Sequence, residues 1–311
     1  MKRGITMNYI LRTFNIVKKY GKNYALDKVN INICEGDIYG FVGENGSGKT
    51  TIIRVITGLI FPDEGTFELF GCRNTDLKIN DVKKKIGAIV ESPSIYMNMS
   101  AYDNLKMQCD IIGVKDYNKI YEVLKDVGLH GLYSNKKTAS NFSLGMRQRL
   151  GIAMALLGDP KFLILDEPMN GLDPAGIVDI RELIIKLNRE KKITFLISSH
   201  ILTELALVAT KYGIISKGKI IKEISAEQLN NECRKKTIIE VDDGNKAYEV
   251  LSAVNDKENI KMTEKEVVIL GDVKLNIIFK VLIENNITIF NVKCDKDNIE
   301  DYYLNVTKGG N

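Results

Sequence analysis

The segment Gly43-Glu44-Asn45-Gly46-Ser47-Gly48-Lys49-Thr50-Thr51 restricts the possible folds of this chain more than any other stretch. Two of its glycines flank four residues, and Lys-Thr follows directly, which is the spacing of a phosphate-binding loop. Glycine lets the backbone curl, so that several N–H groups converge on one phosphate chain without obstruction by side chains. Lys49 adds a positive charge for the β- and γ-phosphates, and the Thr50 hydroxyl can bind Mg²⁺.

The residues on either side of this loop fit a strand–loop–helix unit. Residues 37–42 form a short apolar run typical of a strand. Residues 51–60 carry isoleucine and leucine at helical spacing, which predicts a helix from Lys49 to about Gly58. The positive end of that helix dipole would face the phosphate. The alternative, a glycine-rich turn that matches by accident, leaves both flanks unexplained.

Composition limits the remaining possibilities. The 311 residues suggest about two domains, and the 44 basic and 40 acidic residues nearly cancel, so charge gives no argument for nucleic acid. The sequence has five cysteines, Cys34, Cys72, Cys109, Cys233 and Cys294. They form no CxxC pair, and we expect neither disulfides nor metal binding from them. Since no run of 18 apolar residues exists, a membrane role would require partner subunits.

A second strong pattern is the apolar run at residues 161–165, which ends in Asp166 and Glu167. Such a run predicts a strand that is buried on both faces. Its two carboxylates follow at the C-terminal end, where open α/β sheets bind ligands. Asp166 is placed to hold Mg²⁺ through water, and Glu167 to orient and deprotonate an attacking water. The alternative is two surface acids after a core strand.

Two other polar residues lie at the ends of predicted elements. His200 ends an apolar strand at residues 193–199, where it could hydrogen-bond the γ-phosphate, although a lone histidine is usually structural. Ser143 has the chemistry of a helix N-cap, and the helix it opens extends to Leu157. That helix start is either an ordinary cap or a second anion site made of a hydroxyl and free N–H groups.

The rest of the chain gives weaker signals. Residues 8–41 alternate apolar and polar and predict antiparallel strands with a turn at 21–23. Tyr20 lies at that turn, either as a surface tyrosine or as a ring stacked on adenine. Residues 100–131 have a helical pattern, and residues 171–174 predict a turn before a helix from Ile177 to about Glu190. From residue 225 the composition shifts towards Lys, Asn and Glu, and alternating strand and helix patterns predict a small α+β unit without a catalytic constellation.

Taken together, these motifs resemble the ATP-binding cassette family over about residues 8–224. The phosphate loop, Asp166-Glu167, Gly171-Leu172-Asp173 as the D-loop and His200 as the switch histidine follow in the family's order. The resemblance implies an α/β P-loop NTPase fold over residues 1–224, with a RecA-like core, an antiparallel β subdomain and an α-helical subdomain at about 92–158. Residues 225–311 would form an α+β accessory domain. The resemblance also implies that Tyr20 stacks on the adenine.

Two positions depart from the family pattern. The signature Leu-Ser-Gly-Gly-Gln reads Phe142-Ser143-Leu144-Gly145-Met146 here, and the retained serine and second glycine still imply nucleotide contact from residues 143–146. Glu91 stands where the family has glutamine. A carboxylate only accepts hydrogen bonds and adds negative charge near the metal, so this is either neutral drift or a subfamily mark. We expect Glu91 to sense the metal.

The finer resemblance concerns function. Residues 89–96, 143–150 and 299–304 look like those of the bacitracin-resistance and lantibiotic-immunity exporters. This implies a subunit that binds ATP and Mg²⁺ and hydrolyses ATP to power export of antimicrobial peptides. One chain has one phosphate loop and one signature, so we expect a head-to-tail pair of cassettes. Integral membrane permease subunits, docked near residues 92–140, would hold it at the cytoplasmic face of the cell membrane.

Two other functions stay open on the sequence. One is a soluble cassette ATPase acting on ribosomes or DNA, although such members usually have two cassettes or a long coiled coil, and we expect no nucleic acid partner. The other is a regulatory module in which residues 225–311 sense a ligand.

Overall fold

The computed structural model describes residues 8–232, 235–256, 259–271, 273–296 and 299–308. Cys233 lies outside these ranges. Contacts divide the chain into two compact units, Met1–Ala226 and Glu227–Asn311. Each unit has its own cluster of buried apolar side chains.

A six-stranded sheet forms the centre of the first unit, in the order β11-β10-β4-β9-β8-β7. Its strands are β4 (Ile38–Val42), β7 (Ile86–Ile89), β8 (Phe162–Asp166), β9 (Thr194–Ser199), β10 (Lys211–Ser216) and β11 (Lys219–Ser225). All neighbours are parallel except the hairpin β10–β11. Every residue of β4, β8 and β9 is buried, which confirms the strands predicted from apolar runs. Their C-terminal ends meet at one edge of the sheet.

A second, antiparallel sheet is built from the N-terminal part of the chain. Its path is β2-β1-β5-β6, and β3 also pairs with β1. The strands are β1 (Tyr9–Tyr20), β2 (Asn23–Val29), β3 (Asn32–Cys34), β5 (Glu64–Leu69) and β6 (Cys72–Arg73). Tyr20 pairs with Asn23 across the predicted turn. The expected antiparallel subdomain is therefore present.

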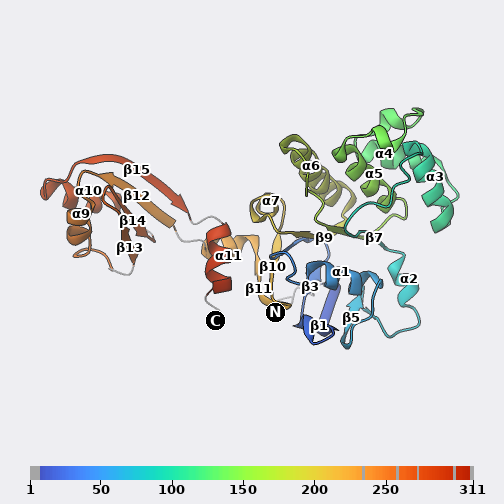
Figure 1. The fold of residues 1–311 in the computed structure, drawn as a ribbon, viewed down its shortest axis with the longest axis horizontal. Helices are drawn as coiled ribbons and strands as arrows, with labels where there is room; N and C mark the ends of the chain where they lie inside the picture. The colour runs from blue at the N-terminus through green and yellow to red at the C-terminus, as the bar shows by residue number, and fades with distance from the viewer. Residues whose placement is uncertain (1–7, 233–234, 257–258, 272, 297–298, 309–311) are drawn as a thin grey trace, which may run out of the picture. The chain divides into compact units, whose positions relative to one another are not determined.

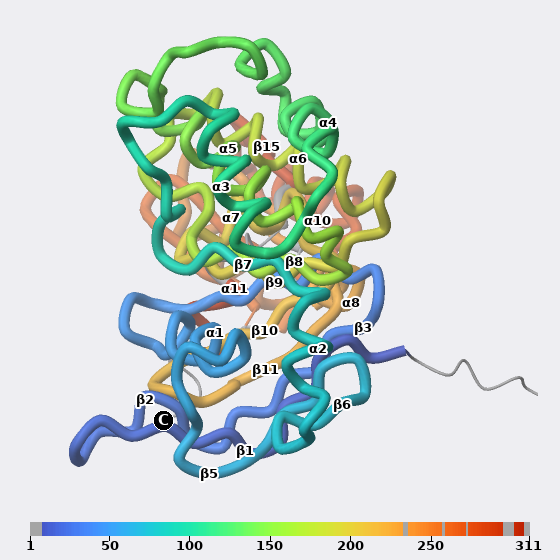
Figure 2. Tube along the Cα trace, turned by 90° about the vertical axis from the view of Figure 1, so that its right-hand side faces the viewer, coloured from blue at the N-terminus to red at the C-terminus, as the bar shows by residue number. Residues whose placement is uncertain are grey.

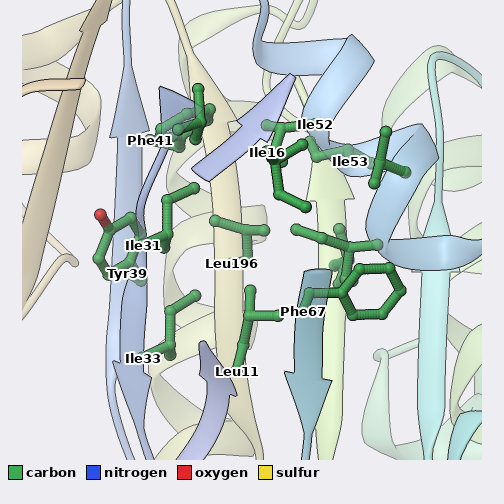
Figure 3. Close-up of a cluster of buried hydrophobic side chains, with 14 of the residues drawn as sticks. Leu11, Ile16, Ile31, Ile33, Tyr39, Phe41, Ile52, Ile53, Phe67 and Leu196 are labelled. Carbon is green, nitrogen blue, oxygen red and sulfur yellow. The ribbon is translucent and has the colours of Figure 1, made fainter. Parts of the chain in front are cut away.

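Helix α1 (Lys49–Thr57) and the two sheets share one hydrophobic cluster. Figure 3 shows Leu11 and Phe67 of the antiparallel sheet converging with Leu196 of the parallel sheet and with Ile52 and Ile53 of α1. Complete burial of such a side chain is worth about 1.5–3 kcal/mol. The buried face of α1 therefore fixes the helix that follows the phosphate loop.

Figures 1 and 2 show the parallel sheet between two layers. On one side lie α1 and the antiparallel sheet, and on the other lie α3 (Ala101–Ile112), α4 (Asn118–Asp126), α5 (Leu144–Leu156) and α6 (Pro174–Lys191). Short 3₁₀ turns η1 (His130–Leu132) and η2 (Ala139–Asn141) connect α4 to α5. The helices α2 (Ile79–Lys83) and α7 (Leu202–Ala206) complete the unit. The helical pattern predicted for residues 100–131 is confirmed by α3 and α4.

The second unit is a four-stranded antiparallel sheet with helices. The sheet has the order β13-β14-β12-β15, and α8 (Ala226–Glu232) and α11 (Ile299–Lys308) stand at the ends of the unit's sequence. The elements between them are β12 (Lys235–Val241), α9 (Gly244–Leu251), β13 (Ile260–Met262), β14 (Glu266–Leu270), α10 (Leu275–Glu284) and β15 (Ile289–Lys296). Apolar side chains of α9 and α10 share a buried cluster with β12 and β14. In the part of the chain that the structure describes, none of the helices has the length and hydrophobicity that a membrane crossing requires.

Gly87 in β7 allows α5 to approach the sheet closely. A Cβ atom at this position would lie 2.5 Å from the backbone oxygen of Ala155 in α5 and 2.6 Å from Cδ1 of Leu163. We expect Gly87→Ala to lower the free energy of unfolding by about 1–3 kcal/mol, because the backbone of α5 has to move. Urea denaturation followed by circular dichroism measures the change.

The control for this substitution is Gly131→Ala in η1. A Cβ there would meet no atom within 4 Å, so we expect a change of less than about 0.5 kcal/mol. An equal loss of stability in both variants would contradict the packing role of Gly87.

Candidate functional site

The loop between β4 and α1 has a backbone that only glycine permits at several points. Gly46 and Gly48 have φ values of 79° and 111°, in the region that other residues rarely adopt. A Cβ at Gly43 would lie 2.5 Å from the backbone oxygen of Ile215, and one at Gly48 would lie 2.5 Å from that of Ala25. The glycines therefore allow the loop to fit against β2 and β10 while its backbone stays uncovered.

The start of α1 adds donors to this loop. The N–H of Ile52 bonds to the oxygen of Gly48, so the N–H groups of Lys49, Thr50 and Thr51 lie ahead of the first such bond. The hydroxyl of Ser47 is buried, and it has no hydrogen-bond partner among the described residues. Free N–H groups at a positive helix end bind anions well. The loop thus has the donor set of a phosphate site.

Lys49 is 5% exposed, and its ammonium group is held inside the loop. It donates to the oxygens of Gly43 at 2.7 Å and Glu44 at 3.2 Å. Its Nζ also lies 3.3 Å from Oε1 of Glu167, which follows β8. The second oxygen of that carboxylate, Oε2, lies 2.7 Å from Nδ1 of His200. The structure therefore brings Lys49, Glu167 and His200 into one polar cluster at the edge of the sheet.

Ser198 on β9 holds both acidic residues at the end of β8. Its hydroxyl donates to Oδ1 of Asp166 at 2.5 Å and accepts from the N–H of Glu167 at 2.9 Å. Asp166 is 2% exposed, and Glu167 has a left-handed φ of 49°. Ser198 was not predicted from the sequence, although a serine that interrupts an apolar strand was a usable signal. This hydroxyl holds the carboxylate of Asp166 and the backbone of Glu167.

A cavity of about 210 Å³ lies over these residues. It is lined by Ala25, Asn45, Gly46, Gly48, Lys49, Thr50, Thr51, Glu167 and Asn170. Most of these belong to the predicted phosphate loop. Ala25 and Asn170 were not predicted; the signal for Asn170 was its place at the turn just after Glu167. The lining combines backbone donors, one ammonium group and two threonine hydroxyls, which is the chemistry that a phosphate chain requires.

Tyr20 lies at the end of β1, in the hairpin whose second strand brings Ala25 to the cavity. The residue is 52% exposed, and the ammonium of Lys18 lies 6.0 Å from the ring centre. About half of its surface is therefore accessible to a ligand. Stacking on adenine stays a prediction.

Ser143 to Met146 and Asp173 form a separate group. Ser143 caps α5, since its hydroxyl accepts from the N–H of Met146 at 3.2 Å, as predicted. Asp173 caps α6 in the same way through Gly176, so α6 begins at Pro174 rather than at the predicted Ile177. A Cβ on Gly171 would lie 3.4 Å from Leu144. None of these residues is among those that line the cavity.

Glu91 lies just beyond β7 and contacts a residue that the sequence did not indicate. Its Oε1 lies 2.5 Å from Nη2 of Arg54 on α1. The Glu91 side chain is 61% exposed. The backbone of Glu91 has a φ of 64°. In this arrangement its charge is paired with arginine. Among the described residues, no group of three or more His, Cys, Asp or Glu side chains forms a metal site alone.

The chain is similar to known proteins in its sequence. The family model described as ABC transporter matches residues 26–170. The bacitracin transport ATP-binding protein BcrA of Bacillus licheniformis is 42% identical over 309 residues, covering 98% of this chain and 99% of BcrA. The lantibiotic transport ATP-binding protein SrtF of Streptococcus pyogenes is 45% identical over 216 residues, covering 69% of this chain and 90% of SrtF.

A solved structure also matches. It is the dimeric structure of a post-hydrolysis state of the ATP-binding cassette MJ0796 bound to ADP and Pi, with a TM-score of 0.62 and 26% identity. The match covers 70% of this chain and 98% of that chain.

The contact between Lys49 and Glu167 predicts an effect on nucleotide affinity that does not involve hydrolysis. Glu167→Gln removes a negative charge 3.3 Å from the ammonium that would bind phosphate. We expect ADP to bind about threefold to tenfold more tightly without Mg²⁺. The neutral glutamine would repel the phosphates less than the carboxylate does, and it would compete less for Lys49. Calorimetric titration with ADP in EDTA measures the dissociation constant.

The control is Glu190→Gln, the same change at an exposed position near the end of α6. It should leave ADP affinity unchanged. Unchanged affinity in Glu167→Gln would show that this carboxylate does not compete for Lys49.

Proposed function

This chain belongs to the ABC transporter family as an ATP-binding, ATP-hydrolysing subunit, and we propose that it powers the export of peptide antibiotics of the bacitracin and lantibiotic kind. The observation that carries the cargo class is the match to a bacitracin transport protein along nearly its whole length. That match includes the second unit, which lies outside the family model. The relative named for lantibiotic transport supports the same class.

In the proposed reaction, each residue of the polar cluster has one task. The N–H groups of the loop and Lys49 hold the β- and γ-phosphates. Glu167 takes a proton from a water whose oxygen bonds to the γ-phosphorus, while the bond to the β–γ bridging oxygen breaks. His200 donates a hydrogen bond to the γ-phosphate, and the Ser198 hydroxyl keeps Glu167 in position.

The residues present fit Mg²⁺ as a cofactor. Thr50 at the start of α1 and the buried Asp166 supply the hydroxyl and carboxylate oxygens that this cation prefers when most other ligands are water and phosphate. Bound there, the cation would neutralise phosphate charge. Glu91 would sense it, and Tyr20 would stack on the adenine.

The separation of the site residues into two groups supports a dimer. Ser143 to Met146 carry an N-cap hydroxyl and free N–H groups, yet they do not line the cavity of their own chain. We infer that these residues and Asp173 contact the nucleotide held by Lys49 of a second cassette. Two such cassettes, arranged head to tail, would enclose two ATP molecules.

Permease subunits would dock on a groove beside α3. Two adjoining cavities of about 420 and 940 Å³ share Pro93, Ser94, Gln108, Ile111 and Met154 in their lining. Ile111 is 65% exposed and Tyr96 46%, so apolar surface is open along this groove. Such a surface fits an amphipathic helix of an integral membrane subunit. This docking would keep the cassette at the cytoplasmic face of the membrane.

The rival function, on ribosomes or DNA, is not favoured by the relatives.

Trapping the dimer tests the reaction and the arrangement together. We expect Glu167→Gln to reduce ATP hydrolysis by at least about a hundredfold, since removal of a general base typically costs that much. With Mg²⁺ and ATP this variant should run as a dimer in light scattering. Adding Ser143→Arg should return it to a monomer, because the arginine would block the second nucleotide. Normal turnover in Glu167→Gln would remove Glu167 from its role.

Purification from membranes tests the partner and the cargo class. The tagged chain should co-purify with a polytopic membrane protein, and cells that lose both should become more sensitive to a bacitracin- or lantibiotic-type peptide. Recovery of ribosomes or DNA in place of a membrane protein would overturn the proposed function.

A further inference from the structure

Glu91 has a backbone conformation that requires an explanation. The N–H of Ser92 bonds to the oxygen of Val90 at 2.9 Å, and Glu91 between them has a φ of 64°. This is the geometry of a γ-turn with positive φ, which is rare and strained. The side chain of Glu91 is 61% exposed, so close packing around it does not impose the turn. A specific contact is needed to keep the residue there.

Arg54 provides that contact. It lies on α1, four residues after Thr50, so the two side chains occupy the same face one turn apart. Its guanidinium lies 2.5 Å from Glu91, and a neutral glutamine could not form this ion pair. Along α1, one helical turn, about 5.4 Å, separates Arg54 from Thr50 at the start of the helix.

The segment that follows Glu91 is anchored by a buried residue, which binds it at Tyr96. We call residues 92–99 the strap. Asn104 of α3 is 1% exposed and bonds to both backbone groups of Tyr96, at 2.8 Å to its N–H and 3.1 Å to its oxygen. The strap therefore has a fixed attachment on the helical subdomain and an exposed ionic attachment on α1.

The strap also reaches the segment that precedes Ser143. The N–H of Ala139 bonds to the oxygen of Met99 at 2.9 Å, and that of Ser140 to the oxygen of Met97 at 2.8 Å. Ser140 lies three residues before Ser143 at the start of α5. A continuous series of bonds thus runs from α1 through Glu91 and the strap to the helix start that carries Ser143.

We propose that Arg54 is a positioning residue, which holds Glu91 on α1 and thereby sets the position of the strap and of the Ser143 segment relative to the phosphate loop. The exposed ion pair is the contact in this series that can break and form again, whereas the hydrogen bonds of Asn104 persist. Arg54 also occupies the Glu91 carboxylate, so release of the pair is what makes that carboxylate available to the metal. This last step rests on the proposed function, whereas the tie itself does not.

Hydrogen–deuterium exchange of peptides covering the strap tests the proposal without nucleotide. Arg54→Ala and Glu91→Gln should each speed exchange in residues 92–99 by about threefold to tenfold, because the strained turn relaxes once the pair is lost. The double variant should exchange no faster than either single variant, since both break one interaction. The charge-reversed pair Arg54→Glu with Glu91→Arg should restore much of the protection.

Arg73→Ala is the control, because Arg73 is also an exposed arginine in an ion pair, at 3.2 Å to Glu68. It should leave exchange in the strap unchanged. ADP affinity, measured in parallel, keeps the two hypotheses apart. If Arg54→Ala binds ADP like the original chain and the strap exchanges at the same rate, the proposal is wrong and the proposed function stands. If the unaltered chain does not bind ADP, the proposed function is wrong instead.

Discussion

Convergence of backbone N–H groups around one anion is the constraint on which the first unit depends. The loop needs glycine at several positions to allow it, as the positive φ of Gly46 and Gly48 and the close approach to Ala25 and Ile215 demonstrate. A glycine-rich loop cannot hold its own shape, because glycine loses the most conformational freedom on folding. The order comes from outside the loop, from the fully buried strand β4 before it and the buried face of α1 after it. The antiparallel sheet completes the core that fixes α1 (Figure 3).

Features with local signals could be predicted from the sequence. The strand–loop–helix unit, the buried strand that ends at Asp166 and the N-cap at Ser143 depend on residues close together in the chain, and the structure contains all three. Errors occurred where the local signal was short or ambiguous. The three-residue β13 and the five-residue α2 were missed, because neither is long enough to have a period. The start of α6 was placed late, since Asp173-Pro174 indicates both a turn and a helix N-terminus.

Contacts between distant elements could not be predicted in the same way. Ser198 lies 32 residues after Asp166, and its hydroxyl reaches that carboxylate only because β9 is the neighbour of β8. The pairing of Arg54 with Glu91 likewise depends on α1 and the end of β7 lying side by side. Sequence patterns give the residue types for such contacts, but the sheet order decides which of them meet. The sheet order itself follows from packing that no single segment specifies.

Two glutamates with a strained backbone connect these observations. Glu91 and Glu167 follow the neighbouring parallel strands β7 and β8, and both have a left-handed backbone, with φ of 64° and 49°. Each leaves the extended conformation within two residues of the end of its strand. Their supports differ: buried Ser198 accepts from the N–H of Glu167, whereas exposed Arg54 only pairs with the side chain of Glu91. A backbone anchor in the core suits the proposed role of Glu167 as a general base. A surface ion pair breaks more readily, and it therefore suits the proposed release of Glu91 from Arg54.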